Sequence, residues 1–182
     1  KKEILKIEKT SLVYTSVDKE FSGKDTNIGV YSLDKIKELE NSTYNELFEK
    51  SFGSWEDFWK KSEIKIKSSD EFDSLALNFS LYHMRIMTPF HDNRFSIGAK
   101  GLTGEGYKGH VFWDTEIFML PFFLYTNPKA ARQLLEYRYG NLNEAKKKAL
   151  SKNYKGALFP WESAFDGKEE TPEFAAINIK TG

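Results

Sequence analysis

Two segments of the chain are apolar on more than one side at helical spacing, and this limits the folds that the chain can adopt. Residues 70–87 carry one apolar helical face, and Leu77, Leu81 and Met84 make the opposite face apolar as well. Residues 110–125 repeat the pattern. A helix that is apolar all round is normally buried between neighbours. The pattern therefore predicts a mainly α fold in which both helices lie inside a larger helical domain.

Capping residues predict where the helices begin and end. Ser68 and Glu71 have the spacing of a capping box before residues 70–87. Asn127–Pro128 supplies an N-cap and an N1 proline for a further helix, which we expect to break near Gly140–Asn141 and to resume to about Leu150. Three short helices are predicted upstream, with starts at Ser32 (ending at Leu39), at Thr43 with Glu46, and at Ser54 with Asp57.

The first thirty residues have a different pattern. Leu5, Ile7, Leu12 and Tyr14 alternate with polar residues, as in a half-buried strand pair. Residues 21–29 are polar and contain glycine, so they read as a linker. We expect a short N-terminal β segment ahead of the helices.

Composition excludes several classes of protein. Lysine and arginine (27) balance aspartate and glutamate (27), so no net field favours nucleic acid or an anionic membrane. The chain has no cysteine, which excludes disulfides and thiolate chemistry. Its three histidines are not at metal-ligand spacing, so we expect no zinc or iron site. With no long apolar run and no signal peptide, we expect a cytoplasmic protein with no nucleic-acid or membrane partner.

Two long loops depart from the pattern of an ordinary helical domain. They are TPFHDNRFSIGAKGLTGEGYKG (88–109) and NYKGALFPWESAFDGKEETPEF (153–174). Loops this long inside a compact domain are usually functional or disordered, and their many aromatic residues argue against disorder. Because both loops abut buried helices, we expect a rigid frame to present them together.

The segment GHVFWDTEIF (109–118) places two carboxylates among large apolar side chains. On a helix Asp114 and Glu116 would lie about 200° apart, so they cannot form a facing acid–base pair. His110, Trp113, Asp114 and Ile117 would share one face, and Pro121 would kink the helix further on. An indole beside a carboxylate suits a neutral polyol, because the ring covers C–H faces and the carboxylate accepts hydrogen bonds from hydroxyls.

The second loop repeats this pairing as Trp161–Glu162. Two interpretations of the pairs are open. They either bind a sugar together, or they are a buried tryptophan and an aspartate favoured by the helix dipole. In the first case, all four residues should converge on one cavity.

Longer stretches around these pairs are similar to a known family. GLTGEGYKGHVFWDTEIFMLPFFLYTNP (101–128) resembles the signature of glycoside hydrolase family 65, which includes maltose, trehalose and kojibiose phosphorylases. LLEYRY (134–139) and YKGALFPWESAFDGKEETP (154–172) resemble the segments that follow it. The resemblance is strong over residues 89–172. Residues 13–59 look like the family's exit from a β-sandwich domain and its helical linker.

The resemblance implies a partial (α/α)6 barrel, or toroid, with inner helix ends that carry the active site. It implies three regions: the end of an N-terminal β-sandwich domain and linker (1–30), a helical linker (31–67) and the start of the catalytic barrel (68–182). It also implies a homodimer for the full-length protein.

The implied chemistry is inverting phosphorolysis of an α-linked glucose disaccharide. A glutamic acid protonates the glycosidic oxygen, and inorganic phosphate attacks the anomeric carbon to give β-glucose 1-phosphate and glucose. The residues that match the family's sugar contacts are Trp113, Asp114, Trp161 and Glu162. Phosphate is the co-substrate, and no cofactor or metal is expected.

This sequence departs from the family in two respects. It lacks the Gly-Pro-Asp-Glu-Tyr-like segment with the general acid and the lysine- and serine-rich phosphate site. We therefore assign no catalytic residue and expect the isolated chain to be inactive. A hydrolase of the same family and a non-catalytic, carbohydrate-binding helical scaffold are the alternatives.

Other polar residues carry weaker predictions. Asp92 and Arg94 suit either a loop ion pair or a ligand contact. Lys146–Lys148 reads as a solvated helix end, and Glu169 and Glu170 read as surface loop charges. His83, on an apolar helix face, reads as a satisfied core group.

Overall fold

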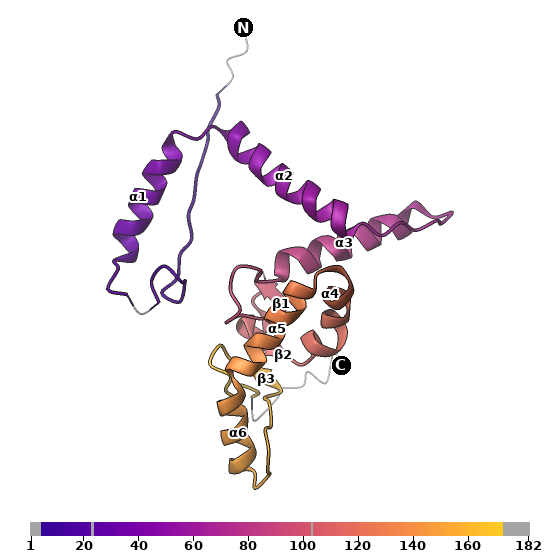
Figure 1. Cartoon of the computed structure of the whole chain (residues 1–182). Helices are drawn as coiled ribbons and strands as arrows, with labels where there is room; N and C mark the ends of the chain where they lie inside the picture. Colours follow the sequence, from indigo (N-terminus) through magenta and orange to yellow (C-terminus); the bar gives the residue numbers. More distant parts are fainter. Residues whose placement is uncertain (1–4, 23, 103, 173–182) are drawn as a thin grey trace, which may run out of the picture. The chain divides into compact units, whose positions relative to one another are not determined.

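The computed structural model describes residues 5–22, 24–102 and 104–172 (Figure 1). The chain divides into two compact units, Lys1–Lys61 and Ser62–Gly182, which are described separately. Helices predominate in both units, so the predicted mainly α class is confirmed. Among the described residues, no helix combines the length and apolar character needed to cross a membrane.

The first unit contains helices α1 (Ile28–Glu40) and α2 (Tyr44–Ser62). Asn27 caps α1 by accepting a hydrogen bond from the Val30 N–H, while the Ser32 hydroxyl donates to the Ile28 carbonyl inside the helix. The predicted start at Ser32 is therefore wrong. Asparagine accepts this bond as readily as serine, and it lies at the real helix boundary.

Helix α2 begins with the predicted capping box. The Thr43 N–H donates to the Glu46 carboxylate (2.7 Å), and the Glu46 N–H donates to the Thr43 hydroxyl (3.3 Å). The helix continues through Ser54 without a break, so the separate helix predicted there is wrong. A serine followed by an acid is a start signal only where the preceding backbone is not already helical.

The predicted N-terminal strand pair is absent from the described residues. Residues 5–15 form no ladder, and Leu5 and Ile7 are exposed. A strand needs a neighbour to pair its backbone groups, and the described part of the first unit provides none. The Tyr14 ring instead packs edge-on against Phe21, with 5.7 Å between the ring centroids.

The second unit begins with α3 (Glu71–Met87), which is capped by Asp70 rather than by the predicted Ser68–Glu71 box. The Asp70 carboxylate accepts from the Phe72 N–H at 2.9 Å, and the Ser68 hydroxyl donates to Asp73. An acceptor one residue from the helix start is better placed than one three residues away.

The apolar surface of α3 is largely open in this structure. Phe72, Leu75 and Phe79 are each more than 60% exposed, whereas Leu81 is buried. No other described element covers that face, so the neighbours that the apolar pattern predicts are not found among the described residues of this chain. The ring of His83 lies 4.2 Å from that of Phe79.

The segment predicted as one helix over 110–125 has three parts. Strand β2 (Val111–Phe112) comes first, followed by the π-helical turn η2 (Thr115–Met119) and by α4 (Leu120–Thr126). The helix prediction is wrong over the first residues because β2 pairs with strand β3 (Glu162–Ser163), far away in the sequence. Pro121 is the second residue of α4 and follows directly on the π-helical turn η2.

The next two helices agree with prediction. They are α5 (Pro128–Gly140), capped by the Asn127 side chain, and α6 (Leu142–Ser151). The first long loop contains β1 (Ala99–Leu102) and the short 3-10 turn η1 (Gly106–Gly109).

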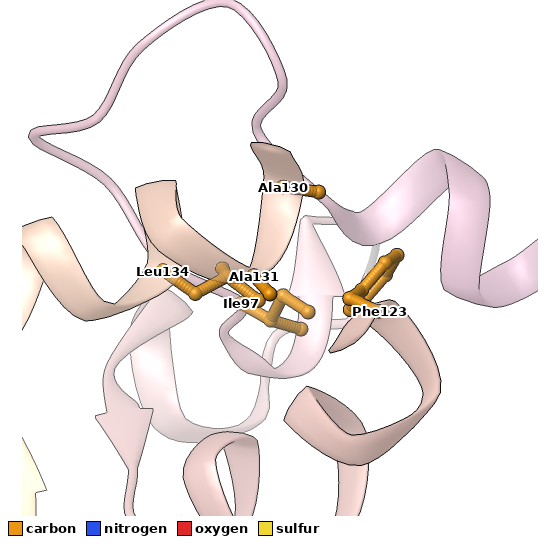
Figure 2. Close-up of a cluster of buried hydrophobic side chains, with 5 residues drawn as sticks. All are labelled: Ile97, Phe123, Ala130, Ala131 and Leu134. Atoms are coloured by element: carbon orange, nitrogen blue, oxygen red, sulfur yellow. The ribbon is translucent and has the colours of Figure 1, made fainter. Parts of the chain in front are cut away.

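The core of the second unit lies between α5, α4 and the loop before β1. Figure 2 shows its buried side chains, and these are Ile97, Phe123, Ala130, Ala131 and Leu134. Small alanine side chains let α5 approach the loop closely, so Ile97 is only 1% exposed. This packing fixes the first long loop against α5 and positions the segment that leads into β2.

Candidate sugar-binding site

The two tryptophan–carboxylate pairs adjoin the paired strands β2 and β3, because Trp113–Asp114 follows β2 and Trp161–Glu162 leads into β3. The strands are antiparallel, with Phe112 opposite Glu162 and Val111 opposite Ser163. The same register carries the chain on to Trp113 and Trp161, whose ring centroids are 5.6 Å apart with an interplanar angle of 58°. The two pairs therefore lie next to each other, as expected, whereas their convergence on one cavity stays a prediction.

Both indoles are open to solvent. Trp113 is 42% exposed and Trp161 is 55% exposed, although large aromatic side chains are usually mostly buried. The two adjacent rings are tilted relative to each other and together form one exposed, bent apolar surface. Such a surface can cover the C–H groups of a ring-shaped polar ligand.

Asp114 follows Trp113 at the start of the helical segment that leads into η2. Its side chain is exposed and makes no hydrogen bond to any other described residue. Asp114 therefore has carboxylate oxygens that accept from no described residue, one position after the Trp113 indole.

Glu116 differs from Asp114 in having a protein partner. The Arg138 guanidinium donates two hydrogen bonds to the Glu116 carboxylate, both at 2.9 Å, and both side chains are mostly buried. A bidentate pair of this kind satisfies the charge inside the domain. Of the two carboxylates in the segment, Glu116 is structural and Asp114 is available to a ligand.

Glu162 is only 7% exposed and is held by a histidine. The Nδ1 atom of His110 lies 2.8 Å from Glu162 Oε1. The prediction that His110 shares a helix face with Trp113, Asp114 and Ile117 is wrong, because the backbone from His110 to Phe112 is extended. The extended backbone instead turns the His110 ring toward the opposite strand.

Helix α5 anchors the strand that carries Glu162. The Tyr137 hydroxyl is hydrogen-bonded to Ser163 Oγ (2.8 Å) and to the Ala164 carbonyl (2.9 Å). Burial raises the pKa of Tyr137, so its hydroxyl keeps its proton at neutral pH. The neutral Tyr137 hydroxyl on α5 therefore holds β3 in position.

Glu169 is a functional candidate that the sequence did not reveal, since we predicted a surface charge. Its carboxylate accepts from the backbone N–H groups of Trp161 and Glu162, each at 3.0 Å, and from the Thr171 hydroxyl at 2.6 Å. It also forms an ion pair with Lys148 on α6. The prediction that Lys146–Lys148 is a solvated helix end is therefore wrong for Lys148, because its side chain forms an ion pair with Glu169.

The surroundings of Glu169 strongly favour its ionised form. Burial alone raises its pKa, but the hydrogen bonds from Lys148, from Thr171 and from two backbone N–H groups outweigh burial and lower the pKa to about 2. The carboxylate is therefore charged at every pH at which the protein is expected to work. The sequence alone gives little indication that Glu169 binds the Trp161 and Glu162 N–H groups, because only the folded contacts show this.

The first long loop also tests the interpretation of Asp92 and Arg94. Arg94 donates to Asp92 at 2.7 Å, and Asp92 is 2% exposed, so the ion-pair interpretation is confirmed. Asn93 and Arg94 also contribute to a cavity of about 500 Å³ at the end of α5. None of the four predicted sugar contacts lines this cavity, whose other lining residues are Glu136, Tyr137, Tyr139, Gly140, Asn141, Phe165 and Asp166.

No cluster of three or more metal-ligating side chains occurs within residues 5–22, 24–102 and 104–172. The chemistry of the described site is that of two indoles, one free carboxylate and one histidine-bound carboxylate. These groups can accept hydrogen bonds and cover apolar faces.

Comparison with known proteins gives one consistent result. Residues 78–182 match the model of the glycosyl hydrolase family 65 central catalytic domain. Kojibiose phosphorylase of Halothermothrix orenii is 52% identical over 99% of this chain and 23% of its own length. The kojibiose phosphorylase of Escherichia coli is 54% identical over 85% of this chain and 20% of its own length.

A solved structure supports the same relationship. A putative kojibiose phosphorylase from the human microbiome superposes with a TM-score of 0.70 at 40% identity, over 78% of this chain and 18% of that chain. The chain thus spans about a fifth of the length of the relatives that it matches.

Proposed function

The chain belongs to glycosyl hydrolase family 65, and from this we propose that it forms the donor-sugar side of an inverting disaccharide phosphorylase. The proposed substrate class is α-linked glucose disaccharides. Among these we propose kojibiose, because two relatives that are more than half identical to this chain carry the name kojibiose phosphorylase.

One observation carries the proposal at the level of the site. The exposed indoles of Trp113 and Trp161 adjoin each other, and the unpaired carboxylate of Asp114 follows directly after one of them. Glucose presents apolar C–H faces and a rim of hydroxyl groups. In our proposal the indoles cover a C–H face while Asp114 accepts hydrogen bonds from adjacent hydroxyls.

Glu162 has a narrower role in this proposal. One of its oxygens is occupied by His110, so the carboxylate can offer its second oxygen to a hydroxyl group. Its low exposure restricts it to a group that enters the site deeply. Asp114 therefore provides the outer polar contact and Glu162 the inner one.

The proposed reaction breaks the bond between the anomeric carbon and the glycosidic oxygen. An oxygen of inorganic phosphate forms the new bond to that carbon from the opposite face, and a carboxylic acid from another part of the protein protonates the departing oxygen. The products are β-glucose 1-phosphate and glucose. Phosphate is already anionic, so the mechanism needs no protein base and no cofactor.

We also propose a cytoplasmic location and a homodimeric full-length protein. A charged sugar phosphate is useful to a cell only where the membrane retains it, which supports the location. Sizing chromatography of the full-length protein tests the dimer.

The test of the proposed function is a substrate panel on the full-length protein. Kojibiose, maltose, trehalose and nigerose are each incubated with and without inorganic phosphate, and glucose and β-glucose 1-phosphate are measured. We expect phosphate-dependent release of both products, fastest from kojibiose. Release of glucose without phosphate would identify a hydrolase, and sugar binding without any release would identify a non-catalytic scaffold.

A further inference from the structure

We propose that Glu169 is a positioning residue for sugar binding, which holds Trp161 and Glu162 in place through their backbone N–H groups. This inference rests on the proposed function of the Trp161–Glu162 pair. Glu169 itself does not need to touch the sugar, because its carboxylate oxygens are occupied by other groups of the protein.

The first argument is the geometry of the carboxylate. Oε2 of Glu169 accepts from the Trp161 N–H and Oε1 accepts from the Glu162 N–H, each at 3.0 Å. Two consecutive backbone donors are thus bound by the two oxygens of one side chain. This arrangement fixes the orientation of the peptide between Trp161 and Glu162, and with it the directions of both side chains.

The second argument is the anchoring of Glu169. Lys148 of α6 forms an ion pair with the carboxylate and also lies 3.4 Å from the Phe159 carbonyl oxygen. Thr171 donates its hydroxyl to the same carboxylate. We call the contacts of the Glu169 carboxylate with Lys148 and with the Trp161 and Glu162 N–H groups the clamp. The clamp joins the segment around Trp161 to helix α6, and Figure 1 shows the loop after α6 running back beside this helix.

The third argument is the hairpin that brings Glu169 back to Glu162. The Glu170 N–H donates to the Glu162 carbonyl (2.9 Å) and the Ala164 N–H donates to the Lys168 carbonyl (3.1 Å). Gly167 makes the turn with φ +79°, which a residue with a Cβ rarely adopts. The chain is therefore built to return a carboxylate to this position.

A glutamate is needed here for its charge and its two equivalent acceptors. Glutamine would keep one carbonyl oxygen but would present an N–H₂ group where the second acceptor stands. That group would face a backbone N–H donor and the Lys148 ammonium. Glu169→Gln should therefore release the Trp161–Glu162 peptide while changing the size of the side chain little.

The test compares Glu169→Gln with Glu170→Gln in the full-length protein. Glu170 is the adjacent exposed carboxylate, so its variant removes the same charge without the clamp. For Glu169→Gln we expect kcat/KM for the disaccharide to fall about tenfold or more. The KM for phosphate should change less than about twofold, because the resemblance to the family implies a phosphate site in another part of the full-length protein. Glu170→Gln should match the parent in both constants.

A second measurement is independent of activity. Two indoles with centroids 5.6 Å apart couple their transitions, so the Trp113–Trp161 pair should give a paired circular dichroism band that Trp161→Phe identifies. We expect Glu169→Gln to weaken this band and Glu170→Gln to retain it. A parent protein inactive on every sugar would refute the proposed function, whereas the band would still report whether Glu169 positions Trp161.

Lys148→Met gives a further test if Glu169→Gln does not fold. It removes the Lys148 ion pair but leaves both Glu169 carboxylate oxygens in place as acceptors for the two backbone N–H groups. We therefore expect the same changes in kinetics and in the indole band, but smaller ones. Parent-like kinetics and an unchanged indole band in a folded Glu169→Gln protein would overturn the proposal. If only Lys148→Met folds, the same result for that variant would do so.

Discussion

The side chains of Arg138 and Glu116 are joined by two parallel hydrogen bonds of 2.9 Å between α5 and the turn η2. This pair separates the roles of two carboxylates that are nearly adjacent in the sequence. Glu116 holds the turn against α5, and the exposed Asp114 is left free to bind a ligand. The two residues therefore predict opposite results in mutagenesis.

Replacement of Asp114 by asparagine should impair function without affecting the fold. Its carboxylate has no partner among the described residues, so the change leaves no group of the described protein unpaired. A charged hydrogen bond contributes roughly 1.5–3 kcal/mol, so kcat/KM of the full-length protein should fall at least about tenfold. Normal turnover by a correctly folded variant would instead indicate a structural aspartate.

Replacement of Glu116 by glutamine should have the reverse effect. It leaves the mostly buried Arg138 without its charged partner, and we expect a loss of about 1.5–3 kcal/mol in unfolding free energy by denaturant titration. The control is Glu144→Gln, which removes a surface ion pair with the exposed Lys147 and should cost less than about 1 kcal/mol. Equal losses for the two variants would contradict a structural role for Glu116.

Removal of the Trp161 indole should weaken sugar binding. The side chain is 55% exposed, so Trp161→Ala should fold normally and lower the affinity for the disaccharide by about twofold to tenfold. Tyr125 is 90% exposed and lies in the same unit, which makes Tyr125→Ala a matched control for losing an aromatic ring. Titration calorimetry would measure both, and equal affinities for the two variants would exclude an indole contact.

Local signals predicted two of the helix starts correctly. Asn127 and Pro128 begin α5, and Thr43 with Glu46 begins α2, because a cap depends on residues within one turn. The same locality explains the wrong start at Ser54. A capping pattern can occur inside a helix that already has its own start.

Long-range contacts explain what the sequence did not predict. The extended backbone before Trp113 depends on pairing with β3, and helical periodicity cannot report a partner that far along the chain. The position of the Glu169 carboxylate depends both on the ion pair with Lys148 and on the turn at Gly167. By contrast, the pairing of Trp113 with Trp161 was predictable from the repeated indole–carboxylate dipeptide.

Acid should remove the contribution of Glu169 to stability. The pKa of Glu169 is lowered from 4.5 to about 2 in the folded protein, so its ionised form stabilises the fold above about pH 4.5. That contribution is lost as the pH falls from about 4.5 toward 2. The difference in unfolding free energy between the parent and Glu169→Gln should therefore be full at neutral pH and shrink in acid. A difference that is constant over this range would show that Glu169 is not the titrating group.

The exposed face of α3 predicts how residues 1–182 behave when expressed alone. Phe72, Leu75 and Phe79 are 66%, 63% and 63% exposed and share one side of the helix. Contiguous apolar surface of this kind is rare on a soluble monomer, so the chain should self-associate. Sizing chromatography with light scattering should show a mass above 21.1 kDa that rises with concentration.

The matched variants for this prediction are Leu75→Glu and Ser80→Glu. Leu75→Glu places a charge within the exposed apolar face, and because the side chain is already solvated it should reduce association while costing little stability. Ser80→Glu adds the same charge at another exposed position on α3, outside these three side chains. We expect Ser80→Glu to associate like the parent. A parent chain that elutes as a monomer with one sharp thermal transition would show that this face needs no cover, and an equal effect of both variants would assign the association to net charge rather than to the apolar face.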